Sequence, residues 1–459
     1  MEDMHRYTLE TAELEAAIVE YATWRLSLDP PPLDRAERPE ILAARVGATI
    51  TARGLGGREA LRIYREELGP AMISTDHPLF LAFVPAAPTK ASVLFDLVVS
   101  ASSTVGSTWM EAAGGVYAEN QALRWLADLA GLPDAAGGVF VSGGSAGNLS
   151  GLVAARHTAE ARRNADGLPR PGRWRIAAVD EAHSSIRSAA RIMDAGVVAV
   201  AADERGRLTG ANLRAALDAA PHEVLDGVFA VVATAGSTNV GIVDDLAGVA
   251  DVCAERGLWF HVDAAYGGAA LAAPSVRPLF DGIERADSLV IDPHKWLFSP
   301  YDCAALLYRD PALAAAAHTQ EAAYLDDVNT SGEWNPTHYA YHLTRRLRGL
   351  PFWFSLASHG TDAYRAGVEH VLRLTRSVAD RIGEHPDLDL LIEPELSVVV
   401  FRRRGWSGDD YVAWSKRLLD EQTAFVLPST WDGERVMRFC FVNPLTTVDE
   451  VTALLDTMG

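Results

Sequence analysis

The stretch WFHVDAAYGG, residues 259–268, reads as a short apolar strand that ends at Asp263 and is followed by small residues. In sheets of parallel strands, ligands bind beyond the carboxyl ends of the strands, which is where this carboxylate would lie. A carboxylate at that place can keep a pyridinium nitrogen protonated, and the charged ring then acts as an electron sink. The same aspartate can also serve as the N-cap of the next segment, so both interpretations stay open at this point.

Similar apolar runs occur on both sides of this stretch, and segments with helical periodicity separate several of them. Residues 245–256, for example, predict a helix with Asp245 as its N-cap. Continuous apolar strands that alternate with helices predict a largely parallel sheet covered on both faces. The expected strands are Val139–Val141, Val197–Ala202, Val228–Ala233, Trp259–Val262, Ser288–Ile291 and Ala304–Tyr308.

The two ends of the chain follow other patterns. Residues 8–26 have apolar side chains at helical spacing, and the prolines at positions 30–32 then end that helix. After about residue 350, a long helix at 361–382 precedes strands at 397–402 and 436–442. We therefore expect a helical arm over residues 1–85, a large domain over 86–350 and a smaller α+β domain over 351–459.

Charge and composition exclude several classes of protein. The chain carries 41 Lys and Arg against 61 Asp and Glu, a net charge of −20, whereas nucleic acids bind clustered basic side chains. The three cysteines lie far apart and form no CxxC pair, so we expect buried free thiols in a reducing cytosol, without a metal site or disulfides. The sequence shows no secretion signal and no run of ~18 apolar residues, which predicts a soluble cytoplasmic protein with no membrane partner.

The stretch DPHKW, residues 292–296, directly follows an apolar strand and contains Lys295. Its apolar neighbours predict that the lysine is buried, and a buried ammonium is unfavourable unless it is paired or reacts. A Schiff base with an aldehyde cofactor resolves this conflict, and desolvation is expected to lower the pKa of Lys295 and to favour the reaction. The pattern alone leaves a structural lysine open as the alternative.

Three further polar stretches also follow apolar runs or lie near one. The glycine-rich SGGSAGNL at 142–149 precedes a helix, so its backbone N–H groups can contact a phosphate, although glycine turns at such places are common. The stretch DEAHSS at 180–185 contains His183, which can stack on an aromatic ring or be structural, and ATAGSTN occupies 233–239. All five stretches can meet at one edge of the sheet. Together they match a ligand with a phosphate, an aromatic ring, a pyridinium nitrogen and an aldehyde.

In order and spacing, the glycine cradle, EAHSS, ATAGST, HVDAAYGG and DPHKW resemble the group II pyridoxal-5′-phosphate (PLP) amino-acid decarboxylases, from about His77 to Tyr364 and more loosely beyond. That family includes aromatic-L-amino-acid, tyrosine, histidine and glutamate decarboxylases, and bacterial members of the aromatic branch are the most similar. The resemblance implies an α/β fold of the aspartate-aminotransferase type, with a mostly parallel large-domain sheet and a smaller α+β C-terminal domain. It also implies a homodimer with shared active sites.

The resemblance assigns roles to residues of the cofactor site. It implies that Lys295 forms the Schiff base, that Asp263 pairs with the pyridine nitrogen, and that His183 stacks on the ring opposite Ala265. The remaining implied cofactor contacts are Gly143, Gly144, Ser145, Ser237, Asp292 and His294. Asp292 stands where the family often has Asn, and a second negative charge beside a phosphate is unfavourable unless it is neutralised.

Further matches concern the substrate. Tyr324 resembles the loop tyrosine that protonates the reaction intermediate in the neighbouring subunit, and residues 326–333 are expected to form a polar, mobile loop. Arg345 matches an arginine pair that follows this loop, although without the family its basic cluster would read as a solvated helix face. The implied substrate-binding residues are Phe83, Pro85, Ala86, Val105, Ser107 and Arg345. Ser107 replaces what is often Phe and Ala86 what is often Thr, so the pocket is reshaped relative to the aromatic enzymes.

The expected activity is decarboxylation of an L-amino acid, with an aromatic substrate favoured, to the amine and CO2. Asp263 would stabilise the electrons left behind, and Tyr324 with His183 would supply the proton. One alternative is an oxygen-consuming reaction that yields an aldehyde, but relatives of that kind often lack the stacking histidine or the loop tyrosine. The other alternative is a catalytically silent scaffold, against which the joint presence of Lys295, Asp263, His183 and Tyr324 argues.

Overall fold

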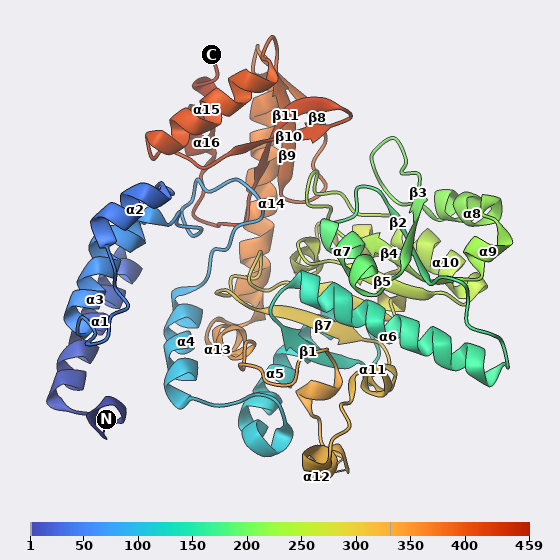
Figure 1. Ribbon diagram of the computed structural model, residues 1–459. Coiled ribbons are helices and arrows are strands. Elements are labelled where there is room, and N and C mark those ends of the chain that lie inside the picture. The colour runs from blue at the N-terminus through green and yellow to red at the C-terminus, as the bar shows by residue number, and fades with distance from the viewer. Residues whose placement is uncertain (1, 331) are drawn as a thin grey trace.

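Within residues 2–330 and 332–459, which the computed structural model describes, the chain is built around a large sheet of seven strands (Figure 1). These strands are β1 (Gly137–Val141), β2 (Arg175–Val179), β3 (Gly196–Val200), β4 (Val228–Thr234), β5 (Trp259–Asp263), β6 (Ser288–Ile291) and β7 (Ala304–Tyr308). Their spatial order is β1-β7-β6-β5-β4-β2-β3, and β7 runs antiparallel to both of its neighbours while the other pairs are parallel. The largely parallel sheet predicted from the apolar runs is confirmed.

Helices cover both faces of this sheet, so successive residues of a strand contact opposite layers. In β1, Phe140 belongs to the hydrophobic cluster of one layer, whereas Val139 and Val141 belong to that of the other. The first layer includes α5 (Trp109–Leu129), α8 (Gly210–Ala219) and α10 (Leu246–Arg256), and the second includes α6 (Gly144–Ala165), α7 (Ser184–Ile192) and α11 (Pro311–His318). Other helices of this region are α4 (Lys90–Ser102), α9 (His222–Leu225), α12 (Asp326–Thr330) and α13 (Leu350–His359). Burial on both faces explains why these strands are apolar throughout.

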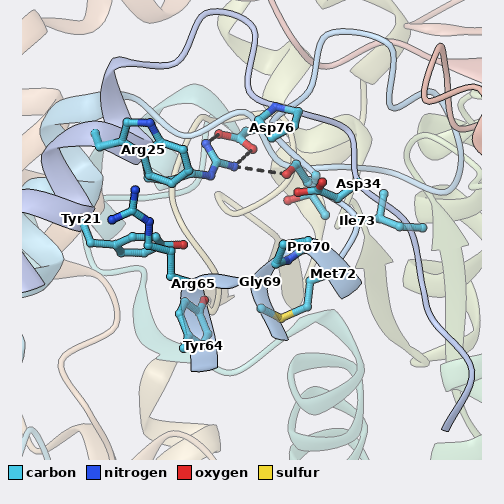
Figure 2. Close-up of a pocket in the computed structure, with 14 residues that line it drawn as sticks. Tyr21, Arg25, Asp34, Tyr64, Arg65, Gly69, Pro70, Met72, Ile73 and Asp76 are labelled. Carbon is cyan, nitrogen blue, oxygen red and sulfur yellow. Dashed lines mark hydrogen bonds and ion pairs between the residues drawn. The ribbon is translucent and has the colours of Figure 1, made fainter. Parts of the chain in front are cut away.

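The N-terminal arm lies beside the rest of the molecule, at the left of Figure 1. It comprises α1 (Leu9–Ser27), α2 (Pro39–Val46) and α3 (Gly57–Ile63). Neither α1 nor α2 has a buried side chain among the described residues, and the apolar Ile18 and Trp24 are 44% and 43% exposed. Arg25 ties the arm to the body through an ion pair of 2.8 Å with Asp76, at the edge of a hollow that Tyr21 also lines (Figure 2). One chain therefore leaves much apolar surface of the arm uncovered.

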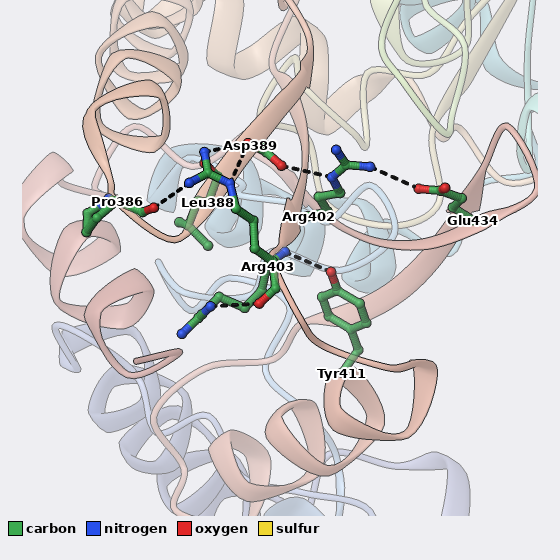
Figure 3. A network of polar contacts seen from close by, with 8 residues as sticks. Pro386, Leu388, Asp389, Arg402, Arg403, Tyr411 and Glu434 are labelled. Carbon is green, nitrogen blue, oxygen red and sulfur yellow. Dashed lines mark hydrogen bonds and ion pairs between the residues drawn. The ribbon is translucent and has the colours of Figure 1, made fainter.

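A second sheet follows the long helix α14 (Thr361–Glu384). In the described part of the chain it has four antiparallel strands in the order β10-β11-β9-β8. They are β8 (Leu388–Ile392), β9 (Val398–Arg403), β10 (Leu427–Trp431) and β11 (Glu434–Cys440), packed with α15 (Gly408–Asp420) and α16 (Val448–Asp456). On β8, Asp389 accepts hydrogen bonds from Arg402 and Arg404, whereas the backbone N–H of Arg403 donates to the Tyr411 hydroxyl at 2.8 Å (Figure 3).

No helix in the described part of the chain combines the length and apolarity that crossing a membrane requires. Cys253, Cys303 and Cys440 are buried free thiols.

Candidate functional site

The segments that follow several strands of the large sheet meet around one cavity of about 330 Å³. Because these strands are parallel, their carboxyl ends share one edge of the sheet, and the loops beyond them converge there. The lining comprises Ser142, Gly143, Gly144 and Ser145 after β1, Asn148 in α6, His183 after β2, Thr234, Gly236 and Thr238 at the end of β4, Asp263, Ala265 and Tyr266 at the end of β5, and Asp292, His294, Lys295 and Tyr301 after β6. The structure thus brings all five sequence motifs to a single place.

Lys295 is held by a carboxylate within the cavity. Its Nζ lies 2.8 Å from Oδ2 of Asp292, whose side chain is 2% exposed. Burial alone would lower the pKa of Lys295, but the charges of Asp292 and Asp263 raise it above the ordinary value. The lowered pKa expected from desolvation is therefore wrong, because Asp292, three residues earlier in the chain, pairs with Lys295.

Asp292 also contacts the start of α6. The backbone N–H of Gly144 donates to Asp292 Oδ2 at 3.2 Å, and Asp292 Oδ1 is buried without a hydrogen-bond partner among the described residues. A Cβ atom on Gly144 would lie 3.0 Å from the Cβ of Ala265 and 3.0 Å from Asp292 Oδ2, so only glycine fits there without displacement. The first turn of this 22-residue helix offers backbone N–H groups and positive potential to an anion.

His294 is fixed by the loop that follows it. Its Nδ1 accepts a hydrogen bond of 2.9 Å from the backbone N–H of Cys303, so in the neutral ring the proton is on Nε2, which lies 3.6 Å from Asp292. Burial lowers the pKa of His294. The ring centroid of Tyr301 lies 4.9 Å from that of His294, which places a half-exposed phenol at the cavity beside Lys295.

Asp263 accepts hydrogen bonds at both carboxylate oxygens. The backbone N–H of Ala265 donates to Oδ1 at 3.1 Å, and the side-chain amide of Asn148 donates to Oδ2 at 2.7 Å. His183 caps α7, and its Nδ1 accepts a hydrogen bond of 3.2 Å from the backbone N–H of Ser185. Two side chains of opposite chemistry, a carboxylate and an imidazole, are therefore held in defined orientations at the cavity.

Some cavity residues were not predicted from the sequence. Asn148, Thr234 and Tyr301 line the cavity without having been assigned a role, although Asn148 stands within the quoted glycine-rich stretch. The predicted contact Ser237 is not among the lining residues, whereas its neighbours Gly236 and Thr238 are. Asn148 and Thr234 belong to quoted stretches, but the place of a stretch near the end of a strand does not tell which of its side chains points inward.

The residues predicted to bind substrate do not line this cavity in the single chain. Phe83 and Val105 are 60% and 40% exposed, and Ser107 is buried. Pro85 and Ala86 are buried as well.

Arg345 has a different environment from the one its sequence suggested. Its guanidinium is fully buried, lies 2.8 Å from the carboxylate of Glu119 in α5, and donates to the carbonyl oxygen of Gly106 at 2.8 Å. The reading of its basic cluster as a solvated helix face is wrong, because this long-range ion pair takes Arg345 into the interior. The structure does not bring Arg345 to the cavity. Instead, the contacts of Arg345 hold the segment around Gly106 against α5.

The segment of Tyr324 is more regular than expected. The backbone forms a 3-10 turn at Ala323–Leu325 followed by α12, where a loop was predicted because the residues are polar. The side chain of Tyr324 lies outside the part of the chain that the structure describes.

The cavity fits PLP by its donor set. Lys295 offers an amine to the aldehyde, Asp263 a carboxylate to the ring nitrogen, and His183 a flat ring to the cofactor ring. The first turn of α6 offers backbone N–H groups to the phosphate, although that of Gly144 already donates to Asp292. Asp292 is unfavourable to a phosphate, because it brings a carboxylate to this end of the cavity and its Oδ1 has no hydrogen-bond partner in the described part of the chain.

Comparison with known proteins agrees with this chemistry. The family model for the pyridoxal-dependent decarboxylase conserved domain matches residues 59–404. The chain is 31% identical over 434 residues to an aromatic-L-amino-acid decarboxylase of Bacillus atrophaeus, covering 91% of this chain and 88% of that protein. It is 32% identical over 419 residues to an L-2,4-diaminobutyrate decarboxylase of Rhizobium meliloti (strain 1021), covering 88% and 82%. The crystal structure of Oryza sativa TDC with PLP and tryptamine matches with a TM-score of 0.91 and 26% identity, over 99% of this chain and 98% of that one.

Proposed function

Because the chain belongs to the pyridoxal-dependent decarboxylase family, we propose that it removes the α-carboxylate of an aromatic L-amino acid and releases the amine and CO2. The family, the PLP-dependent transferase fold and the use of PLP to decarboxylate an amino acid are as predicted from the sequence. We further propose an aromatic substrate, roles for the residues at the cavity, and a dimer.

The observation that carries the proposal is the meeting of Lys295, Asp263 and His183 at one cavity. The chemistry that bound PLP supplies is a conjugated ring that accepts the electron pair left on Cα when CO2 departs. Lys295 would hold the cofactor aldehyde through its amine. Asp263 keeps the proton on the ring nitrogen, because its carboxylate is held in place by two hydrogen bonds.

The aromatic preference rests on what the predicted substrate segments contain. Residues 83–86 (FVPA) and 105–108 (VGST) include an aromatic ring and aliphatic side chains but no carboxylate. A substrate with a second amino group, such as 2,4-diaminobutyrate, is bound best where a carboxylate or a dipole faces that group. An aromatic side chain instead needs apolar surface, which Phe83 and Val105 offer.

A homodimer with shared sites accounts for the exposure of those two residues. In one chain Phe83 and Val105 face solvent together with Leu94, Leu97 and Val98 of α4, which are 55%, 59% and 49% exposed. Large apolar side chains that one chain leaves exposed are found on surfaces that another protein covers. A second copy would bring such surface over the cavity of its partner. We also propose a cytoplasmic location, which the buried free thiols support.

A substrate screen tests this function. The purified holoprotein is incubated with the common L-amino acids, dihydroxyphenylalanine and 2,4-diaminobutyrate, and CO2, amine, ammonia and hydrogen peroxide are measured. We expect one aromatic amino acid to have the highest kcat/KM, with amine and CO2 released in equal amounts. A higher kcat/KM for 2,4-diaminobutyrate than for any aromatic amino acid would overturn the aromatic assignment. Release of hydrogen peroxide and ammonia in amounts equal to CO2 would show that the product is an aldehyde and not the amine. Lys295→Ala is the inactive control.

A further inference from the structure

A hydrogen-bond network connects the core of the large sheet to the cavity. It runs from Trp259 and His261 on β5 through Asn148 on α6 to Ser185 on α7. Its internal members His261, Ser288 and Asn148 are at most 1% exposed. In a buried network every donor must face an acceptor, so the identity of one group fixes the direction of the next hydrogen bond.

Asp263 decides which atoms of this network donate and which accept. Its carboxylate only accepts, so the atom of Asn148 that lies 2.7 Å from Oδ2 is the amide nitrogen. The other side-chain atom of Asn148 is then the carbonyl oxygen, which lies 2.9 Å from Nε2 of His261. That oxygen accepts, and His261 Nε2 therefore donates. The reverse orientation of the amide would place an oxygen against a carboxylate oxygen.

The remaining core contacts agree with this direction. Burial lowers the pKa of His261 to about 4, so the ring is neutral and its Nδ1 carries no proton. Nδ1 accordingly accepts from the Ser288 hydroxyl at 2.7 Å. The indole N–H of Trp259 can only donate, and it donates to the same Ser288 oxygen at 2.8 Å. Each group in the core therefore has one consistent role.

On the cavity side of Asn148, the same order of donors and acceptors extends to His183. The second N–H of the Asn148 amide donates to the Ser185 hydroxyl oxygen at 2.9 Å, which leaves that hydroxyl free to donate to His183 Nδ1 at 2.8 Å. The backbone N–H of Ser185 donates to the same nitrogen. With Nδ1 accepting twice, the proton of neutral His183 is on Nε2, the ring nitrogen that these contacts leave unused.

We propose that Asn148 is a positioning residue that aims the Asp263 carboxylate at the cofactor ring nitrogen and, through Ser185, fixes His183 as an N–H donor at Nε2. His261 keeps the Asn148 amide in this orientation. This inference rests on the proposed function for the roles of Asp263 and His183. Its consequence for the reaction is that His183 offers a hydrogen to the substrate and cannot serve as a base without reversal of the network.

The hydrogen-bond directions can be measured without cofactor. Nitrogen-15 NMR of the imidazoles in the apoprotein distinguishes the two neutral tautomers, and the His183 and His261 signals are assigned by their loss in His183→Gln and His261→Gln. Both rings should carry their proton on Nε2. An Nδ1–H tautomer for either ring in the folded apoprotein would overturn the inferred directions, whether or not the protein is a decarboxylase.

The positioning role is tested by Asn148→Asp, which keeps the shape but replaces the donating nitrogen by an oxygen beside Asp263. PLP affinity of the apoprotein, measured by fluorescence titration, should weaken by about 10-fold to 100-fold, as for a lost hydrogen bond to a charged group. The matched control is Asn443→Asp, because Asn443 is also buried and donates to a carbonyl oxygen, that of Asp76. Its PLP affinity should be unchanged.

A second pair of variants tests the same positioning role if Asn148→Asp does not fold. Ser185→Ala removes the hydroxyl between Asn148 and His183 and should weaken PLP binding, whereas Ser185→Thr keeps the hydroxyl and should restore it. Wild-type PLP affinity in folded Asn148→Asp, or in both Ser185 variants, would overturn the positioning role. Failure of the wild-type protein to bind PLP would instead refute the proposed function, and the histidine tautomers would still decide the network.

Discussion

At the scale of single residues, the contact between Lys295 and Asp292 governs how the cavity takes up PLP. Asp292 raises the pKa of Lys295 and so keeps the amine protonated, although the free amine is the form that attacks an aldehyde. The same carboxylate accepts from Gly144 at the helix terminus where the phosphate is proposed to bind. We therefore expect Asp292 to oppose cofactor uptake twice, once through the amine and once through the phosphate.

Asp292→Asn should speed the association of PLP with the apoprotein. Without the carboxylate, the pKa of Lys295 falls, and at a pH below that pKa the fraction of free amine rises about tenfold for each unit of the fall. The gain should shrink as the pH approaches the pKa of Lys295. Stopped-flow absorbance over a range of pH measures this rate. Asp302→Asn, which removes a carboxylate paired with Arg348, is the control, and equal rates for wild type and Asp292→Asn would contradict the prediction.

His261 should make stability depend on pH. Its folded-state pKa of about 4 lies below the ordinary 6.5, so the neutral form is favoured by folding. The stabilisation is complete above pH 6.5 and is lost as the pH falls toward 4, by up to about 3 kcal/mol at about 1.4 kcal/mol per unit. Urea unfolding of the apoprotein should show a steeper loss for wild type than for His261→Gln over that window. Parallel curves for the two proteins would show that His261 is not the titrating group.

At the scale of elements, the sequence predicts what depends on local pattern and misses what depends on distant contacts. The strands β4, β5 and β6 were predicted because each is a continuous apolar run with both faces buried. Strand β2 begins with Arg175 and was not predicted, and β8 and β10 are largely half-buried, so their patterns are weak. The convergence of the motifs followed from strand ends sharing an edge. The pairings of Asn148 with Asp263 and His261 join residues too far apart in sequence for periodicity to reveal. Lys295 and Asp292 are only three residues apart, but their pairing depends on the conformation of the loop after β6.

The ion pair between Arg345 and Glu119 illustrates such a distant contact and should be important for stability. Arg345→Met would leave the buried Glu119 carboxylate without its partner and should lower the free energy of unfolding by about 3–5 kcal/mol. Replacing both residues by apolar ones should recover part of the loss. Chemical denaturation compares these with Arg346→Met, whose side chain is 36% exposed and pairs with Asp96. Similar small losses at both positions would contradict a buried structural role for Arg345.

At the scale of the whole molecule, the cavity and the residues predicted to bind substrate lie apart in one chain. The predicted cofactor residues other than Ser237 meet at the cavity, but Phe83 and Val105 remain on the surface. Helices α1 and α2 bury no side chain that the structure describes. Sequence patterns in one chain do not reveal which surfaces a second copy covers. The dimer was predicted from family resemblance alone, and exposed apolar surface is the physical observation that supports it.

Subunit exchange tests the shared site. Lys295→Ala and Tyr324→Phe subunits are each expected to form little amine, but a mixed dimer would contain one cavity with both Lys295 and a partner tyrosine. Mixing should therefore restore amine formation above that of either parent, as measured by chromatography after verified exchange. Hybrids no more active than the parents would place Tyr324 within its own subunit or outside the reaction.

Lys295 is the residue on which the proposed chemistry depends most, and its role can be tested directly. The chain has three lysines, Lys90, Lys295 and Lys416, so a covalent label can be assigned without ambiguity. The purified holoprotein is reduced with borohydride and digested, and the pyridoxyl group is located by tandem mass spectrometry. The group should be found on Lys295, and Lys295→Ala should carry none and form no amine. A pyridoxyl group on Lys90 or Lys416, with Lys295 unmodified in active protein, would contradict the assignment of the cavity as the active site.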